Sequence, residues 1–263
     1  MTRTAISPRL AIRIFCSTGA NVNGVRSGGG KRPERWPAGW TVHEVAETPS
    51  TNDDLATAAA RGALDRTVLV AGHQSAGRGR LDRTWEAPPD ASLLVSLLFR
   101  TPGQEPGTLM HRVAIAAVDA CRQVAGVNAG LKWPNDLLVE DRKLAGVLGQ
   151  RLAGGSVVVG LGLNVRWCPP GAARLGPDHD PLDVLAATLA AVDDQPCDIL
   201  DEYRRQLLTI GRRVRVELVG RVMEGRATDV DAEGRLLVTD DSGGEHWLDA
   251  GDVVHLRDTG AES

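Results

Sequence analysis

Three strand-like segments follow one another with no helix between them, and they constrain the fold more than any other feature. They occupy residues 131–139, 144–151 and 156–165 and are rich in Leu and Val. The connections at residues 141–142 and 154–155 contain Asp-Arg and Gly-Gly, which are typical of tight turns between neighbouring antiparallel strands. We therefore expect an antiparallel meander at the centre of the molecule.

Further strands and several helices surround this meander. Alternating apolar residues predict a strand over residues 41–47, and apolar runs predict buried strands over residues 67–73 and 92–99. Apolar residues at helical spacing predict helices over residues 52–61, 108–124, 182–192 and 198–208. Ser50 or Thr51 caps the first of these helices. The pattern predicts an α+β fold with a mixed, largely antiparallel sheet flanked by helices.

The pattern changes beyond Gly211, where short strands alternate with turns rich in Asp and Gly. These strands are expected over residues 214–218, 223–230, 235–239 and 245–248. Short strands with tight turns in so small a segment indicate a small β-barrel. With a boundary near Ile210, the chain divides into a larger domain at 36–210, a barrel at 211–258 and a tail at 259–263.

Residues 1–35 differ in composition from the rest of the chain. They hold seven Arg or Lys against one Glu, and we expect a disordered basic tail without the paired helices of a helix-turn-helix. Because the whole chain carries −4, the other 228 residues carry −10. Affinity for nucleic acid comes mostly from neutralising phosphates, so we expect no nucleic-acid partner.

Two absences bear on the location of the protein. No apolar run approaches the roughly 18 residues of a membrane span, which excludes an integral membrane protein built from helices. The four cysteines lie far apart and form no CxxC pair. Widely spaced single cysteines are typical of free thiols in a reducing compartment, so we expect a cytoplasmic protein.

Lysine is scarce in this chain, with 3 Lys against 27 Arg, yet Lys132 and Lys143 fall in one short stretch. Because Arg is a planar fork and Lys a compact charge on a flexible stem, we interpret both positions as requiring lysine itself. Lys132 begins the string Lys-Trp-Pro-Asn-Asp, in which a Pro interrupts a predicted strand. Strand rules are broken most often at functional sites.

A loop from Gln74 to Trp85 combines three Arg with two alternating Gly. Glycine lets the backbone approach a ligand closely, and guanidinium groups bind phosphate, so the loop predicts an anion site. It is neither a Walker loop nor a dinucleotide-binding GxGxxG. The alternative is a solvated Arg-rich surface loop.

These segments together resemble the biotin protein ligases. The matching strings are GRGRxxRxW, KWPND, KLAGxL and GxGLN, in this order and with STN upstream, and the resemblance spans about residues 40–257. It implies a class II synthetase-like catalytic domain, of the biotin/lipoate ligase type, followed by an SH3-like barrel. Leu81-Asp82 departs from the family pattern, and so does Gln150, which stands where Glu is common.

The resemblance also implies a role for each matching residue. Lys143, Arg80 and Asp136 would be catalytic, with Asp136 as a base or orienting group. Biotin would be bound by Ser50, Thr51, Asn52, Gln74, Gly77, Arg78, Gly146 and Leu148. ATP and the adenylate would be bound by Arg80, Arg83, Trp85, Lys132, Asn135, Lys143 and Asn164. No protein ligand is assigned to a metal, although Mg²⁺ is expected with ATP.

The implied reaction has two steps. Biotin is activated with ATP to biotinyl-5′-AMP, and biotin is then transferred to a lysine of the biotin carboxyl carrier protein domain of an acyl-CoA carboxylase. Monomer and homodimer both stay open, and no membrane partner is expected. Three alternatives stay open: a lipoate or octanoate ligase or transferase of the same fold, a biotin-sensing repressor, and a module that binds biotin without turnover.

Overall fold

The computed structural model describes residues 35–81, 83–100, 105–218, 221–249 and 251–256. Apart from Arg35, the predicted basic tail at 1–35 lies outside the described residues, and so does the predicted tail at 259–263. The described residues belong to one compact unit.

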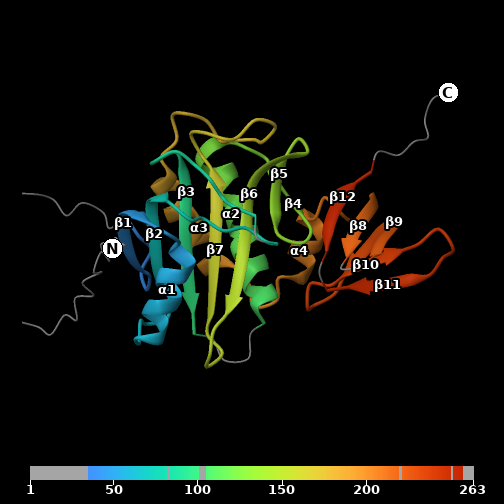
Figure 1. The fold of residues 1–263 in the computed structure, drawn as a ribbon, viewed down its shortest axis with the longest axis horizontal. Coiled ribbons are helices and arrows are strands. Elements are labelled where there is room, and N and C mark those ends of the chain that lie inside the picture. The colour runs from blue at the N-terminus through green and yellow to red at the C-terminus, as the bar shows by residue number, and fades with distance from the viewer. Residues whose placement is uncertain (1–34, 82, 101–104, 219–220, 250, 257–263) are drawn as a thin grey trace, which may run out of the picture. The chain divides into compact units, whose positions relative to one another are not determined.

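A seven-stranded sheet forms the centre of this unit (Figure 1). Its strands are β1 (Thr41–Thr48), β2 (Thr67–Gln74), β3 (Ser92–Phe99), β4 (Gly130–Lys132), β5 (Asp136–Val139), β6 (Arg142–Arg151) and β7 (Val157–Asn164). Their order is β1-β2-β3-β7-β6-β5-β4, in which β1 and β2 are parallel and all other neighbours antiparallel. The predicted mixed, largely antiparallel sheet is confirmed.

Helices cover both faces of this sheet. They are α1 (Thr51–Ala60), α2 (Pro106–Ala125), α3 (Pro181–Asp194) and α4 (Leu200–Gln206). On one face, α2 and α3 pack over Val70, Val95 and Leu161 in the main core. On the other face, α1 packs over Leu98 and Val158. Because successive strand residues point to opposite faces, β3 is buried along its whole length.

Two predicted elements are corrected by the structure. The strand expected over residues 131–139 is a hairpin, in which β4 and β5 are separated by Trp133-Pro134-Asn135 with a cis bond before the proline. Proline has no N–H for a ladder hydrogen bond, which is why the strand ends here. The helix expected over 198–208 is shorter, because Leu207 and Leu208 leave the helix and pair with Leu131.

A second, antiparallel sheet of five strands follows, with the order β11-β10-β9-β8-β12, and we call it the C-terminal sheet. Its strands are β8 (Arg213–Leu218), β9 (Arg221–Val230), β10 (Leu236–Thr239), β11 (Glu245–Leu248) and β12 (Asp252–His255). The four predicted strands are present. Sequence analysis missed β12.

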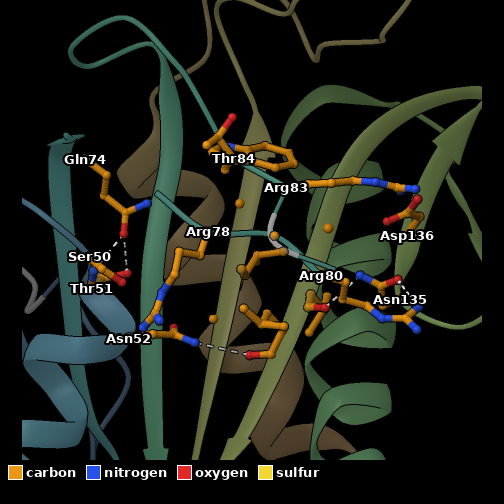
Figure 2. A pocket seen from close by; sticks show the side chains of 18 of the residues that line it. Ser50, Thr51, Asn52, Gln74, Arg78, Arg80, Arg83, Thr84, Asn135 and Asp136 are labelled. Atoms are coloured by element: carbon orange, nitrogen blue, oxygen red, sulfur yellow. Dashed lines mark hydrogen bonds between the residues drawn. The ribbon is translucent and has the colours of Figure 1, made fainter. Parts of the chain in front are cut away.

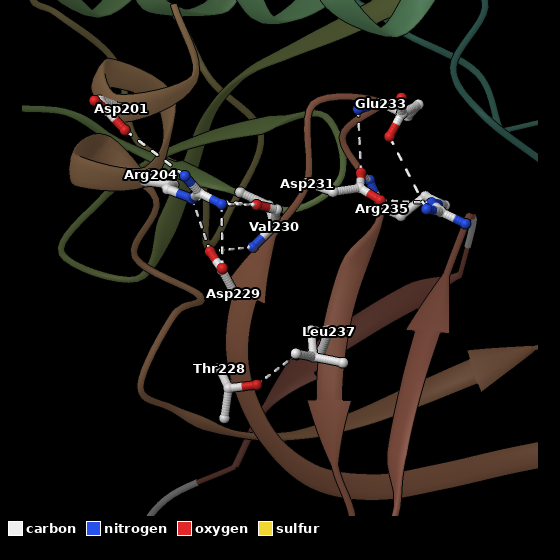
Figure 3. Close-up of polar contacts among 9 residues, drawn as sticks. All are labelled: Asp201, Arg204, Thr228, Asp229, Val230, Asp231, Glu233, Arg235 and Leu237. Atoms are coloured by element: carbon white, nitrogen blue, oxygen red, sulfur yellow. Dashed lines mark hydrogen bonds and ion pairs between the residues drawn. The ribbon is translucent and has the colours of Figure 1, made fainter.

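Arg204 of α4 joins the helix to the C-terminal sheet (Figure 3). Its guanidinium donates to Asp229 at 2.8 Å and to the Val230 carbonyl at 2.8 Å. In the next turn, Asp231 forms an ion pair with Arg235 at 2.6 Å. The same turn contains Gly234, and its carbonyl oxygen accepts a hydrogen bond from the Trp133 indole at 2.8 Å. The β4–β5 hairpin is therefore anchored to the C-terminal sheet.

Thr209 makes a second anchor for this hairpin. Its buried hydroxyl accepts the Trp133 backbone N–H at 3.0 Å and contacts His255 Nε2 at 3.1 Å. Arg212 lies 3.2 Å from His255 Nδ1 and can only donate, so Nδ1 accepts and Nε2 carries the proton. Burial lowers the pKa of His255 to about 4, which keeps the ring neutral at physiological pH.

Within the described residues, no helix is long and apolar enough to cross a membrane. Cys121, Cys168 and Cys197 are free, and burial raises the pKa of the Cys121 thiol to about 12. Cys16 lies outside the described residues.

The Thr209 anchor can be tested by Thr209→Val, which keeps the shape and removes the oxygen. We expect a loss of about 1–3 kcal/mol in the free energy of unfolding, because the buried Trp133 N–H loses its acceptor. Urea denaturation measures this loss. Thr228→Val is the control, since Thr228 is exposed on β9 and should change stability by less than about 0.5 kcal/mol. Equal values for both variants would contradict the anchor.

Candidate functional site

One cavity lies on the α1 side of the sheet, over strands β6 and β7 (Figure 2). In the strand register Gly146 stands opposite Gly162, and Leu148 stands opposite Gly160. A Cβ on Gly160 would lie 2.3 Å from Asn52 Oδ1, and one on Gly162 would lie 2.7 Å from the Trp85 ring. The glycines therefore leave room for side chains that arrive from α1 and from the Gly/Arg loop.

Neutral polar groups gather at one end of the cavity (Figure 2). Ser50 caps α1, with its hydroxyl accepting from the Asp53 backbone N–H at 3.5 Å. The Gln74 side-chain oxygen accepts the backbone N–H of Thr51 at 2.7 Å and lies 2.9 Å from its hydroxyl. Gln74 ends β2, so a strand end and a helix start together form this neutral end.

The loop from residue 74 to 85 folds back as a narrow hairpin. Arg78 and Thr84 form an antiparallel bridge, and the Gly79 N–H donates to the Arg83 carbonyl at 2.7 Å. Gly77 is required here, because a Cβ would lie 2.4 Å from the Trp85 carbonyl oxygen. The hairpin brings Arg78, Arg80 and Arg83 to the lining of the cavity.

Each of the three arginines has a different partner. Arg78 forms an ion pair with Asp53 of α1, and Arg83 forms one with Asp252 of β12. Arg80 donates to Asn135 Oδ1 at 3.1 Å and lies 3.4 Å from the Gly251 carbonyl. Burial lowers the pKa of the Arg80 guanidinium, but arginine stays protonated in proteins. The loop thus meets the C-terminal sheet at the cationic end of the cavity.

Lys143 lies at the same end. Its ammonium is 2.7 Å from Asp136 Oδ1 and 5.7 Å from the centre of the Trp85 ring. The carboxylate compensates the lysine charge, and the ring face adds a cation–π contact. The Trp85 indole N–H is buried and has no hydrogen-bond acceptor among the described residues.

Most residues predicted for the site line this one cavity. They are Ser50, Thr51, Asn52, Gln74, Arg78, Arg80, Arg83, Trp85, Asn135, Asp136, Lys143, Gly146 and Leu148. Gly77, Lys132 and Asn164 do not line it. Gly77 shapes the hairpin, Lys132 borders a smaller cavity, and the Asn164 amide donates to the Ala173 carbonyl at 3.0 Å. Their predicted roles in binding stay predictions.

Sequence reasoning missed several lining residues, including Gly160, Gly162, Thr84 and Asp252. The two glycines belong to a string already singled out, and their spacing of two residues places both on one strand face. Asp252 gave no signal, because it lies more than 150 residues from the loop that it contacts. Only the three-dimensional contact reveals it.

The arrangement suits a ligand with a neutral polar head and an anionic end. Amide and hydroxyl groups at one end can bind a compact polar ring, and Arg80 and Lys143 at the other end can hold a carboxylate or phosphate. The described residues contain no cluster of three or more His, Cys, Asp or Glu able to hold a metal ion. Catalysis by positioning and charge compensation fits this cavity.

Comparison with known proteins identifies close relatives. Residues 46–164 match the Biotin/lipoate A/B protein ligase family, and residues 209–256 match the Biotin protein ligase C terminal domain. The chain is 40% identical to the biotin–[acetyl-CoA-carboxylase] ligase of Mycobacterium tuberculosis, over 84% of this chain and 91% of that protein. It is 31% identical to the Paracoccus denitrificans protein of the same name, over 76% and 90%.

Solved structures share the fold. The biotin protein ligase of Aquifex aeolicus in complex with biotin and ATP superposes with a TM-score of 0.70, at 23% identity, covering 82% of this chain and 99% of that one. The Leishmania major enzyme in complex with biotinyl-5-AMP gives a TM-score of 0.56, at 20% identity, with 80% and 99% covered.

Gly160 and Gly162, with Gly146 opposite, form the floor of the cavity, which we call the glycine floor. The need for glycine in this floor can be tested by Gly160→Ala. We expect overpacking against Asn52 to lower the free energy of unfolding by about 1–3 kcal/mol, measured by urea denaturation. Gly146→Ala is the matched control in the facing strand, because its Cβ would first meet the flexible end of Lys143 at 3.4 Å. A Gly160→Ala protein as stable as the control would show that the floor tolerates side chains.

Proposed function

This chain belongs to the biotin protein ligase family, and from this premise we propose that it activates biotin with ATP and transfers biotin to a lysine of a carrier protein. One observation carries the proposal: a single cavity has a neutral polar end and a cationic end. The neutral end suits the ring of biotin, and the cationic end suits its carboxylate tail and the phosphates of a nucleotide. The 40% identity to a named biotin ligase supports the same activity.

The first step is attack of the biotin carboxylate on the α-phosphate of ATP, which forms biotinyl-5′-AMP and releases pyrophosphate. A carboxylate is already ionised at neutral pH, so this step needs alignment and charge compensation rather than a base. Arg80 and Lys143 lie at the cationic end and would hold the repelling anions together. Ser50, Thr51 and Gln74 would bind the ureido ring at the neutral end.

At the cationic end, phosphate groups would replace the carboxylates that now pair with the basic side chains. Lys143 now contacts Asp136, and Arg83 contacts Asp252. Trp85 lies against the glycine floor with a free indole N–H and would pack against the adenylate. Mg²⁺ would screen the charge of the pyrophosphate. Because Mg²⁺ is usually held by substrate phosphates together with one or two carboxylates, Asp136 and Asp252 are suitable partners.

In the second step the ε-amino group of the carrier lysine attacks the carbonyl carbon of the mixed anhydride and AMP leaves. The amine must lose its proton, because its unperturbed pKa is about 10.4. Asp136 would accept or orient this proton once Lys143 has turned to the phosphate. We propose as the carrier the biotin carboxyl carrier domain of an acetyl-CoA carboxylase, the enzyme named in the close relatives.

The runner-up activity is lipoate or octanoate transfer on the same fold. A flexible acyl chain has no use for the hydroxyl and amide groups of Thr51, Asn52 and Gln74, and this favours biotin. We further propose that the protein works in the cytoplasm, where carriers and ATP meet. A homodimer would be compatible with this activity.

Pyrophosphate release from ATP by the purified protein tests the proposal. We expect release with biotin and none with lipoate or octanoate. Lys143→Ala should lower the rate by at least about 100-fold, because the removed cation compensates charge in the transition state. Arg142→Ala is the control, since this neighbouring arginine is exposed and contacts Glu140. Pyrophosphate release with lipoate alone would contradict the proposal and support the runner-up activity.

A further inference from the structure

The Arg80 guanidinium is held by two oxygens that belong to different sheets. Its Nη1 donates to the Asn135 side-chain oxygen at 3.1 Å, and Nη1 and Nη2 both lie 3.4 Å from the Gly251 carbonyl oxygen. Asn135 lies between β4 and β5 of the seven-stranded sheet, whereas Gly251 directly precedes β12 of the C-terminal sheet. The position of the guanidinium therefore depends on how far apart the two sheets hold these oxygens.

Asn135 is fixed relative to the seven-stranded sheet. Its backbone oxygen accepts the N–H of Val147 at 2.8 Å, and its side-chain nitrogen donates to the Val147 carbonyl oxygen at 3.0 Å. Val147 lies in β6 and is buried in the main core. Because these two bonds orient the Asn135 amide, a change in the distance between the two oxygens has to come from a shift of the C-terminal sheet.

Trp133 joins the C-terminal sheet to the same turn. Its side chain is almost fully buried, and its indole N–H donates to the Gly234 carbonyl oxygen at 2.8 Å. Only Pro134 separates Trp133 from Asn135 in the chain. One short turn thus contacts Arg80 through Asn135 and the C-terminal sheet through Trp133.

The turn that contains Gly234 is held by its own hydrogen bonds (Figure 3). Asp231 Oδ1 accepts the backbone N–H groups of Glu233 at 3.1 Å and of Arg235 at 2.8 Å, and Asp231 Oδ2 pairs with the Arg235 side chain at 2.6 Å. A Cβ on Gly234 would collide with the His111 ring, so glycine lets this turn approach helix α2. The Gly234 carbonyl is therefore a fixed acceptor for the indole.

An exposed ion pair is a weaker link between the same two parts of the protein. Arg83 pairs with Asp252 of β12, but its side chain is 64% exposed, and exposed ion pairs contribute little and are screened by salt. The bond from Trp133 is neutral and its donor is buried, so a loss of its acceptor would leave a buried N–H unsatisfied. Trp133 therefore defines the spacing of the two sheets better than Arg83 does.

We propose that Trp133 is a positioning residue for Arg80. By holding the Gly234 carbonyl, it keeps the C-terminal sheet at the distance where the oxygens of Gly251 and Asn135 both reach the Arg80 guanidinium. The guanidinium then stays in the place where it compensates charge in the first step, and little reorganisation is left for the transition state. This inference rests on the proposed function, and it gives a buried core tryptophan a part in the first step.

Steady-state pyrophosphate release by Trp133→Phe tests the inference, because phenylalanine keeps a ring in the core and removes the indole N–H. We expect kcat to fall about tenfold, since a displaced Arg80 compensates less charge in the transition state. The KM for biotin should stay within about twofold of wild type, because the ring is bound at the neutral end. In an Arg80→Ala background, measured in single turnover at high enzyme concentration, Trp133→Phe should lower the rate no further.

Trp40→Phe is the matched control. Trp40 is also buried, and its indole N–H donates to Asp193 of α3 at 3.0 Å, but neither residue lines the cavity. Both variants lose one indole hydrogen bond and should lose similar stability in urea denaturation. Trp40→Phe should nevertheless keep the kcat of the wild type.

Asp231→Ala tests the same path without a change in the core. It removes the carboxylate that holds the Gly234 turn, and kcat should fall about threefold, again with little change in the KM for biotin. Asp240→Ala is its control and should keep the kcat of the wild type. Asp240 holds the next turn of the C-terminal sheet in the same way, since its Oδ1 accepts the backbone N–H groups of Ser242 at 2.9 Å and of Gly244 at 2.8 Å.

Two results would overturn the inference. One is a Trp133→Phe protein whose kcat equals that of Trp40→Phe. The other is a Trp133→Phe defect of the same size in the Arg80→Ala background, which would show that the tryptophan does not act through Arg80. Wild-type protein that releases no pyrophosphate with biotin would instead overturn the proposed function, so the two failures are distinguishable.

Discussion

The site depends on one steric constraint, the absence of side chains from one face of two paired strands. Gly160 and Gly162 on β7, with Gly146 opposite, let Asn52 and Trp85 approach the sheet backbone closer than any Cβ allows. The same strands carry Leu161 and Val147 on the opposite face, where they belong to the main core. One face of this pair of strands thus packs in the core, and the other face forms the floor of the cavity. The packed core therefore holds the floor in place.

The two ends of the cavity differ in the interactions that they offer to a ligand. At the neutral end, groups from the end of β2, the start of α1 and the middle of β3 lie within hydrogen-bond distance of one another. At the cationic end, Arg80, Arg83 and Lys143 are balanced by oxygens from several elements, among them Asn135, Asp136 and Asp252. Hydrogen-bond direction selects a ligand, while charge balanced by exchangeable partners allows anions to enter and leave.

Sequence reasoning predicts what is local and fails where long-range contacts decide. Apolar runs located β3 and β7. The proline in Lys-Trp-Pro-Asn-Asp marked an irregularity, but did not show that it turns one strand into a hairpin. Family motifs brought most lining residues together, whereas Asp252 carried no motif. The roles of Gly77, Lys132 and Asn164 cannot be decided from their strings alone, because neighbours in sequence point to different places.

The C-terminal sheet contributes to the cavity through the backbone of Gly251 and the carboxylate of Asp252, and it also holds Trp133 at the base of the β4–β5 hairpin. These contacts also join parts of the cavity that are synthesised at different times. A growing polypeptide emerges from the ribosome in order, so the neutral end is synthesised about 200 residues before Asp252, in a protein whose two sheets share one compact unit. The carboxylate that pairs with Arg83 is therefore the last part of the cavity to be synthesised, so the cationic end is completed only when almost the whole chain is present.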